Sequence, residues 1–236
     1  MKVFYRISDA GYKKIKHPLI NNKNCLENFI NNFLNKRDLH NFIILADNIS
    51  NDTFDMIKNF VPEKFIIHCK LGSSAQTFNK VLSLALEQKD DNEIIYFVEN
   101  DYIHRKNSKA IMEEGLELGA DFVCLYDHPD KYIDADKGGN PQIQGGGETT
   151  KVLLSKSTHW KLCNSTTMTF AAKVGTLKET EPIIRKWTTG TYPEDYRMFV
   201  ELGEKGYSLI SPIPSYSTHG ELPWLAPLID WEREIV

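Results

Sequence analysis

Two carboxylates, Glu99 and Asp101, directly follow the apolar run 93–98, which predicts a buried strand. Ligands of a parallel α/β sheet bind at the carboxyl ends of its strands, so these carboxylates, with Asn100 between them, are expected at a binding edge. Oxygen ligands there suit Mg²⁺ or Mn²⁺ that holds a diphosphate. The alternative is an ordinary polar turn in which Asp101 caps the next segment, and the motif alone favours neither interpretation.

A second pair of acids, Glu194 and Asp195, follows Pro193. Proline at a first helical position followed by acids is typical of a helix start, and taken alone this structural interpretation is the stronger one. The functional interpretation is a general base. A carboxylate at a helix N-terminus that faces a cleft can take the proton from an attacking hydroxyl.

His219 and Asp47 are weak candidates for site residues when each is considered alone. His219 lies near the end of the chain, where a lone histidine is usually an ordinary loop residue, but its imidazole could complete a metal shell begun by Asp101. Asp47 follows the apolar run 42–46 and could accept hydrogen bonds from a base or a ribose. It could equally belong to an Asx-rich turn that caps the next helix.

Along the sequence, short apolar runs alternate with helical patterns, and the elements that they predict must position these residues. Such alternation is typical of a βαβ series and predicts an α/β fold. Predicted strands cover 3–7, 42–46, 65–69, 93–98, 121–126, 152–154, 166–172 and 207–214. Predicted helices cover 26–34, 53–60, 72–86, 108–118 and 176–187, and a last one runs from 191–193 to Gly206. The tail after Gly220 is expected to be irregular.

Composition bounds the class of protein. A chain of 236 residues fits one α/β domain, which we divide into a nucleotide-binding half (1–101) and an acceptor-binding, catalytic half (102–236). A net charge of -4 argues against a nucleic-acid binder. The four cysteines form no CxxC pair and are expected to be reduced core thiols, although a disulfide stays open. No secretory signal and no run long enough to span a bilayer is present, so we expect a cytoplasmic protein, with peripheral membrane contact left open.

The segment 127–148 interrupts the regular pattern. It holds five glycines and few large apolar residues, which predicts a mobile loop. It is not a phosphate-binding P-loop, because no Gly-Lys-Ser/Thr sequence follows a strand at the required spacing.

Taken in chain order, these groups resemble the GT-A glycosyltransferases, especially the inverting family 2. The resemblance covers most of the chain, although each motif is short. It rests on 47–53 after the second strand, the helix opening 72–79, the DXD-like 99–101, the ED pair 194–195, His219, and Ser8 and Asp9 after the first strand. Phe78 stands where the family often has a basic residue, and Lys80 or Arg6 could supply the diphosphate contact instead.

The resemblance implies a GT-A fold with a mainly parallel central sheet, and transfer of a sugar from a UDP- or GDP-sugar to a glycan or other hydroxyl acceptor. Asp195 would be the base of an inverting displacement, Glu194 would position a sugar hydroxyl, and Asp101 and His219 would hold Mn²⁺ or Mg²⁺. Ser8, Asp9, Asp47, Asn79, Glu99 and Asn100 would contact the donor. The glycine-rich loop could close over the donor. Trp160, Trp187 or Trp224 could stack on a sugar, although core packing is favoured for Trp187 because it lies on a predicted helix.

Two alternatives stay open. A sugar-1-phosphate nucleotidyltransferase shares the α/β layout, but such enzymes carry a glycine-rich loop with an arginine after the first strand, and residues 8–14 here contain one glycine and no arginine. A non-catalytic nucleotide- or carbohydrate-binding domain could keep the same fold without activity.

Overall fold

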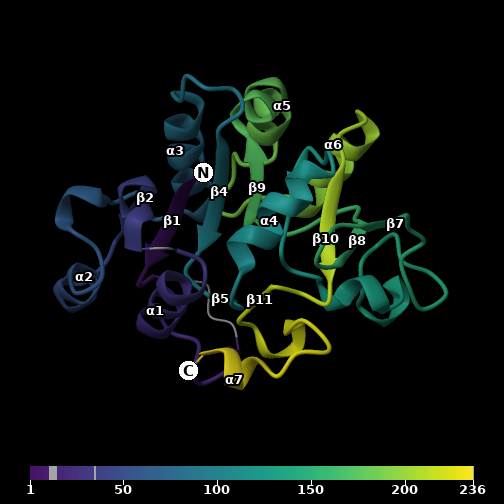
Figure 1. Cartoon of the computed structure of the whole chain (residues 1–236), viewed down its shortest axis with the longest axis horizontal. Coiled ribbons are helices and arrows are strands. Elements are labelled where there is room, and N and C mark those ends of the chain that lie inside the picture. The colour runs from purple at the N-terminus through teal and green to yellow at the C-terminus, as the bar shows by residue number, and fades with distance from the viewer. Residues whose placement is uncertain (11–14, 35, 236) are drawn as a thin grey trace.

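The computed structural model describes residues 1–10, 15–34 and 36–235. Its main sheet has the strand order β3-β2-β1-β4-β9-β6-β10-β8-β7, and β11 and β5 form a small second sheet (Figure 1). The strands are β1 (Lys2–Ser8), β2 (Phe42–Asp47), β3 (Ile66–Cys69), β4 (Ile94–Glu99), β5 (Tyr102–His104), β6 (Phe122–Val123), β7 (Val152–Leu154), β8 (His159–Leu162), β9 (Phe170–Lys173), β10 (Leu209–Ile213) and β11 (Ser217–His219). Strands β3, β2, β1, β4, β6, β10 and β7 run in one direction and β9 and β8 run against them, so the predicted α/β class with a mainly parallel sheet is confirmed.

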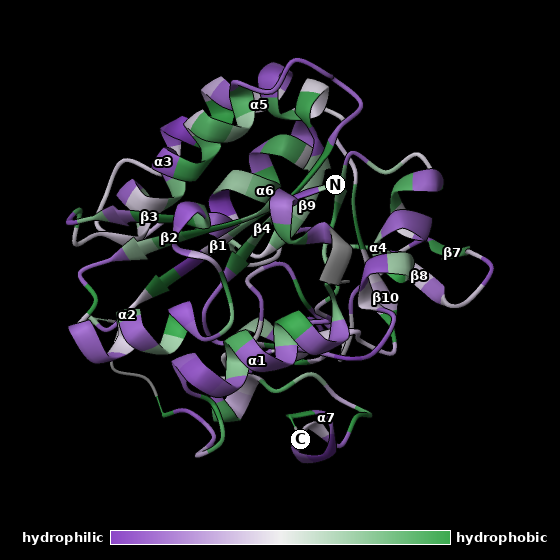
Figure 2. Cartoon of the chain, turned by 60° about the vertical axis from the view of Figure 1, so that its left-hand side comes forward, coloured by the Kyte–Doolittle hydropathy of each residue, from purple (hydrophilic) through white to green (hydrophobic). Residues whose placement is uncertain are grey.

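Helices cover both faces of this sheet. They are α1 (Asn22–Asn32), α2 (Asn51–Lys58), α3 (Ser74–Leu86), α4 (Ser108–Glu117), α5 (Val174–Lys186), α6 (Asp195–Glu204) and the short α7 (Trp231–Ile235). Helices α3, α5 and α6 lie together on one side, whereas α1 and α2 lie on the other (Figure 2). The side chains of strand β1 alternate between the two faces of the sheet. Phe4 therefore packs in the apolar layer under α3, α5 and α6, whereas Val3 and Tyr5 pack in the layer under α1 and α2.

Several predicted boundaries were wrong, and four elements were not foreseen. Only Phe122–Val123 of the predicted strand 121–126 pairs in the sheet, and the predicted strand 166–172 begins at Phe170. Strand β8, the β5–β11 sheet and helix α7 had no sequence prediction. Each is short and carries polar residues or tryptophan, so no periodic apolar pattern marks it.

The segment 127–148 is not the loose loop that its glycines suggest. Lys131 is 2% exposed, and its ammonium donates to Asn164 Oδ1 at 2.6 Å and Ser165 Oγ at 2.5 Å. Asn140 is also buried. A Cβ on Gly139 would stand 1.8 Å from the Ile133 carbonyl oxygen, so here the glycine permits close packing of backbone.

A buried lysine on β8 holds both ends of this segment. The Lys161 ammonium lies 2.9 Å from Asp127 Oδ1 and 3.3 Å from Glu148 Oε2. All three side chains are at most 9% exposed. We call Lys161, Asp127 and Glu148 the Lys161 cluster.

The remaining sequence expectations concern thiols, membranes and the first loop. All four cysteines are free, as expected for reduced thiols, and Cys25 and Cys124 are buried. Among the described residues, none of the helices has the length and apolar character needed to cross a membrane. Residues 11–14, which entered the comparison with a nucleotidyltransferase loop, lie outside the described residues.

Candidate active site

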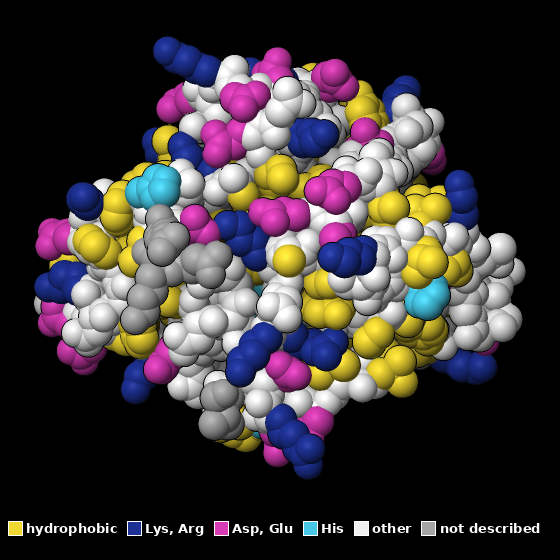
Figure 3. Space-filling view, in the orientation of Figure 1, with side chains coloured by type: hydrophobic (Ala, Val, Ile, Leu, Met, Phe, Trp, Pro, Cys, Tyr) yellow, Lys and Arg dark blue, Asp and Glu magenta, His cyan; other side chains and the backbone are white. Residues whose placement is uncertain are grey.

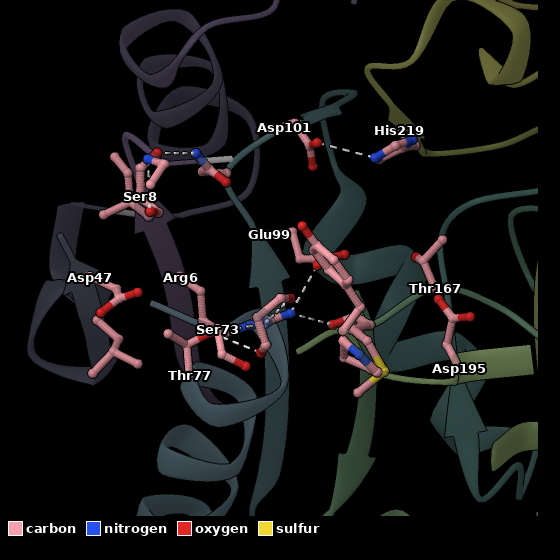
Figure 4. Close-up of a pocket in the computed structure, with 18 of the residues that line it drawn as sticks. Arg6, Ser8, Asp47, Ser73, Thr77, Glu99, Asp101, Thr167, Asp195 and His219 are labelled. Carbon is pink, nitrogen blue, oxygen red and sulfur yellow. Dashed lines mark hydrogen bonds and ion pairs between the residues drawn. The ribbon is translucent and has the colours of Figure 1, made fainter. Parts of the chain in front are cut away.

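A cavity of about 930 Å³ opens at the carboxyl ends of β1, β2 and β4 and is bordered by the starts of α3 and α6. Its lining includes most of the predicted site residues, namely Ser8, Asp9, Asp47, Glu99, Asn100, Asp101, Asp195 and His219. Figure 4 shows Asp47 and Arg6 on one side, Asp195 and Thr167 on the other, and Asp101 with His219 above them. Acidic and basic side chains lie next to each other around the middle of the face drawn in Figure 3.

Asp101 and His219, which are 118 positions apart in the sequence, meet in this cavity. His219 Nε2 lies 3.1 Å from Asp101 Oδ2, and Lys16 Nζ lies 3.0 Å from the same oxygen. Glu221 Oε2 lies 3.8 Å from His219 Nδ1. Burial alone would raise the pKa of Asp101, but the His219 imidazole and the Lys16 ammonium outweigh it and hold that pKa far below its usual range. We call Asp101, His219, Glu221 and Lys16 the Asp101 cluster.

The backbone explains why these residues converge. Strand β11 pairs with β5 so that His219 stands opposite Tyr102, directly after Asp101. The next residue, Gly220, donates its N–H to the Asp101 carbonyl at 2.8 Å and accepts from the His17 N–H at 3.2 Å. A Cβ on Gly220 would stand 2.4 Å from Ile20 Cγ2, so three segments approach each other only because this residue has no side chain.

The donor set of the Asp101 cluster suits a divalent cation in its chemistry. A carboxylate and an imidazole are ligands that Mn²⁺ accepts, and Mg²⁺-type ions normally complete their shell with water and substrate phosphates. In the part of the chain that the structure describes, no group of three or more His, Cys, Asp or Glu side chains is arranged to hold an ion. Asp101 and His219 would therefore supply two ligands, and a bound diphosphate with water would supply the rest.

On the opposite side of the cavity, two of the predicted donor-binding carboxylates position the chain's own loops. Asp47, 4% exposed, accepts the Leu71 N–H at 2.5 Å and the Gly72 N–H at 2.9 Å, which holds the loop before α3. Asp9 accepts the Ser50 N–H at 2.7 Å and the Thr53 hydroxyl at 2.8 Å. Burial alone would raise the pKa of Asp9, but its hydrogen bonds together outweigh burial and lower that pKa overall.

Between these regions, the buried Arg6 forms an ion pair with the partly exposed Glu99. Arg6 Nη2 lies 3.1 Å from Glu99 Oε1, and Arg6 Nη1 donates to the Ser74 carbonyl at 3.1 Å in the first turn of α3. Burial lowers the pKa of Arg6, and the Glu99 carboxylate opposes that effect. Arg6 lines the cavity and Lys80, the other candidate for a diphosphate contact, is not part of the lining.

The two residues of the predicted catalytic pair, Glu194 and Asp195, have different surroundings. Asp195 is the first residue of α6 and lines the cavity. Glu194 precedes the helix, is not part of the lining, and forms an exposed ion pair with Arg197 at 2.8 Å. Asn79 also lies outside the lining, because its amide donates to the Thr188 carbonyl at 2.7 Å and connects α3 with the end of α5.

Other lining residues were missed or only weakly indicated by the sequence. Lys16 had no motif, because its place depends on backbone pairing with the distant segment 220–222. Trp224 was one of three candidate stacking residues, and its ring lies 5.2 Å from that of His128 at the cavity wall. Of the others, Trp160 is fully buried and Trp187 donates to Glu201 at 2.6 Å. Of the segment 127–148, His128 lines the cavity, and closure of this segment over a donor stays a prediction.

Comparison with known proteins yields structural neighbours only. No family model matches the chain, and no curated protein sequence matches it. GalNAc-T7, solved with UDP, GalNAc and Mn²⁺, superimposes with a TM-score of 0.55 at 13% identity over 92% of this chain and 42% of that one. TarS of S. aureus (residues 1–349) superimposes with a TM-score of 0.50 at 12% identity over 89% of this chain and 58% of that one. This chain thus spans well under two thirds of either neighbour, and the likeness establishes architecture: the chain has the GT-A fold of these glycosyltransferases.

Proposed function

We propose that this protein is a metal-dependent glycosyltransferase that moves a sugar from a nucleoside-diphosphate sugar to an acceptor hydroxyl. The observation that carries the proposal is the contact of Asp101 with His219 at 3.1 Å inside a cavity that Asp195 also lines. A pair of cation ligands, the basic side chains of Arg6 and Lys16 in the lining, and a carboxylate at a helix start are groups that this reaction can use.

The donor would occupy the side of the cavity formed by residues 1–101. Ser8, Asp9, Asp47, Glu99 and Asn100 lie there. The loops held by Asp9 and Asp47 would receive the nucleoside, and the diphosphate would lie between Arg6 and the Asp101 cluster. UDP- and GDP-sugars are the donors to test.

In the proposed reaction, Asp101 and His219 would hold a divalent cation, and the cation would supply stabilisation of the negative charge that develops on the leaving diphosphate. Asp195 takes the proton of the acceptor hydroxyl while the acceptor oxygen bonds to the anomeric carbon. The bond between that carbon and the diphosphate oxygen breaks, and the configuration inverts. Arg6 contributes a fixed positive charge on the donor side.

The acceptor would approach through residues 102–236. Trp224 and His128 offer adjacent ring faces at the cavity wall, a surface suited to the apolar face of a sugar. We therefore propose a glycan as the acceptor. Peripheral contact with a membrane and a cytoplasmic location stay predictions from the sequence.

Thermal stabilisation tests the donor site directly. The purified protein is heated with UDP, GDP and their sugar conjugates, each with Mn²⁺ and with EDTA. A ligand at 100 times its dissociation constant adds about 2.7 kcal/mol to the free energy of unfolding. We expect a rise in melting temperature with one nucleotide that EDTA abolishes. No rise with any of them would overturn the proposal.

Replacing Asp195 tests the base. Removing a positioned general base lowers turnover by roughly 10² to 10⁴-fold. Asp195→Asn should therefore lose sugar transfer while its melting temperature still rises with donor and Mn²⁺. Glu194→Gln is the matched control, because Glu194 lies outside the cavity lining and should change transfer little. Transfer by Asp195→Asn at the unmodified rate would remove Asp195 from this role. Donor binding without any turnover in the unmodified protein would favour a non-catalytic binding domain.

A further inference from the structure

Lys16 is the one member of the Asp101 cluster that cannot be a cation ligand while its amine is protonated. We propose that Lys16 is a phosphate-binding residue, whose ammonium leaves Asp101 when a divalent cation binds and then contacts the diphosphate of the donor. This inference rests on the proposed function and adds a residue to its donor site.

The backbone of Lys16 is fixed independently of its ion pair. Lys16 forms a β-bridge with Glu221, the Leu222 N–H donates to the Ile15 carbonyl at 2.9 Å, and the His17 N–H donates to the Gly220 carbonyl at 3.2 Å. These bonds aim the Lys16 side chain into the cavity, where it remains 29% exposed. Release from Asp101 would therefore leave the ammonium in the same cavity.

A cation at Asp101 Oδ2 would compete with the Lys16 ammonium for that oxygen. Asp101 Oδ2 receives the Lys16 ammonium at 3.0 Å and His219 Nε2 at 3.1 Å. A carboxylate oxygen that already accepts from two nitrogens has little remaining capacity for a metal ion. An ammonium beside a doubly charged ion is also strongly repelled. The flexible four-carbon stem of lysine lets the charge move without a change in the backbone.

Two anions are available to the displaced ammonium. One is the donor diphosphate, which carries several negative oxygens in the same cavity. The other is Glu221, the β-bridge partner of Lys16, whose carboxylate lies 3.8 Å from His219 Nδ1. We favour the diphosphate because its charge is larger, and because the Glu221 carboxylate already lies near the His219 imidazole.

The proposal predicts opposite effects of one substitution on two ligands. Lys16→Met keeps the length and packing of the stem but removes the charge. Without nucleotide, Mn²⁺ should bind this variant more tightly, because a competitor for Asp101 is gone. With saturating Mn²⁺, a nucleoside diphosphate should bind about tenfold or more weakly, since one charge-assisted contact is lost.

Titration calorimetry measures both effects. The ligands are Mn²⁺ alone, then UDP and GDP with saturating Mn²⁺, then uridine and guanosine, which lack phosphate. The nucleosides should bind Lys16→Met and the unmodified protein equally. Lys23→Met, at an exposed position of α1 outside the cavity lining, is the matched control and should bind every ligand normally. Lys16→Arg, which restores a cation, should recover part of the diphosphate affinity.

The outcomes separate this inference from the proposed function. If the unmodified protein binds neither UDP nor GDP, both proposals fall. If it binds one of them and Lys16→Met binds it equally well, only the role of Lys16 falls, and Lys16 is then a counter-ion of Asp101 or Glu221. An equal loss of nucleoside and diphosphate binding would also overturn the role, because it would indicate general damage to the cavity.

Discussion

Removal of the positive charge from the Lys161 cluster should destabilise the protein strongly. Lys161 is 2% exposed, and its ammonium lies 2.9 Å from Asp127 and 3.3 Å from Glu148, which are themselves nearly buried. Lys161→Met would leave two carboxylates in a low-dielectric site without their cation. Breaking a buried ion pair by removing one partner costs about 3–5 kcal/mol.

That cost converts into a measurable melting temperature. For a chain of this length, 1 kcal/mol corresponds to roughly 2–4 °C, so the expected drop is about 6–20 °C. Lys178→Met is the matched control. Its ion pair with Asp91 is equally short at 2.6 Å, but the two side chains are 41% and 66% exposed. Such a surface pair contributes about 0–1 kcal/mol, so this variant should lose at most about 4 °C.

The assay is thermal and urea unfolding of both variants, combined with limited trypsin digestion. Trypsin should cleave Lys161→Met within 127–148 earlier than the control, because the segment loses its anchor. Burial alone would lower the pKa of Lys161, but its anionic surroundings, Asp127 among them, raise it above its usual value. A raised lysine pKa means that the stabilisation is complete below the unfolded pKa of about 10.4 and is lost as pH rises further. The difference between the two proteins should thus stay constant from pH 7 to 9. A drop no larger than that of Lys178→Met would refute the reasoning.

Two other substitutions follow from contacts described above. Gly220→Ala places a methyl group 2.4 Å from Ile20 Cγ2 and 2.9 Å from the Asp101 carbonyl, so it should cost about 1–3 kcal/mol in thermal unfolding and weaken Mn²⁺ binding measured by calorimetry. If Mn²⁺ affinity is unchanged, the meeting of segments at Gly220 does not set the cation site. Burial lowers the pKa of His104 to about 3, so the folded protein excludes a proton that the unfolded chain binds below about pH 6.5. Stability should therefore fall by about 2 kcal/mol between pH 7.5 and pH 5 in urea titrations, and His104→Gln should lose this acid sensitivity. Equal pH slopes for the two proteins would contradict a neutral buried imidazole.

The sequence predicted the fold best where apolar runs are long. Strands β1, β2 and β4 are nearly continuous apolar segments, so their positions were found within a residue or two. Strand β6 lies within the predicted strand 121–126 but is much shorter, and strand β8 had no prediction. The pairing in β6 is two residues long, and β8 reads His-Trp-Lys-Leu, whose lysine is buried only because Asp127 and Glu148 neutralise it. Tertiary context, not local pattern, makes that segment a strand.

Within the candidate site, too, the sequence identified some residues correctly and others not. Asp101 was recognisable because it ends a strand, and the topology of a parallel sheet then places it at a binding edge. Glu194 and Asn79 were placed by resemblance to motifs, and the structure turns them toward Arg197 and Thr188 instead. No sequence pattern identified Lys16, because only its backbone pairing with the distant Glu221 brings it to the cavity.

The contact of Asp101 with His219 also has a consequence for the order in which the molecule assembles. Strand β1 pairs with β2 and β4, and all of these strands precede Asp101, whereas His219 lies 118 positions after it. In a growing chain, residues 1–101 of the proposed donor side are therefore complete long before the contact between Asp101 and His219 can form. A chain that ends before β11 would keep the proposed donor residues but lack His219. Under the proposed function, such a chain should lose its cation ligand and with it metal-dependent transfer.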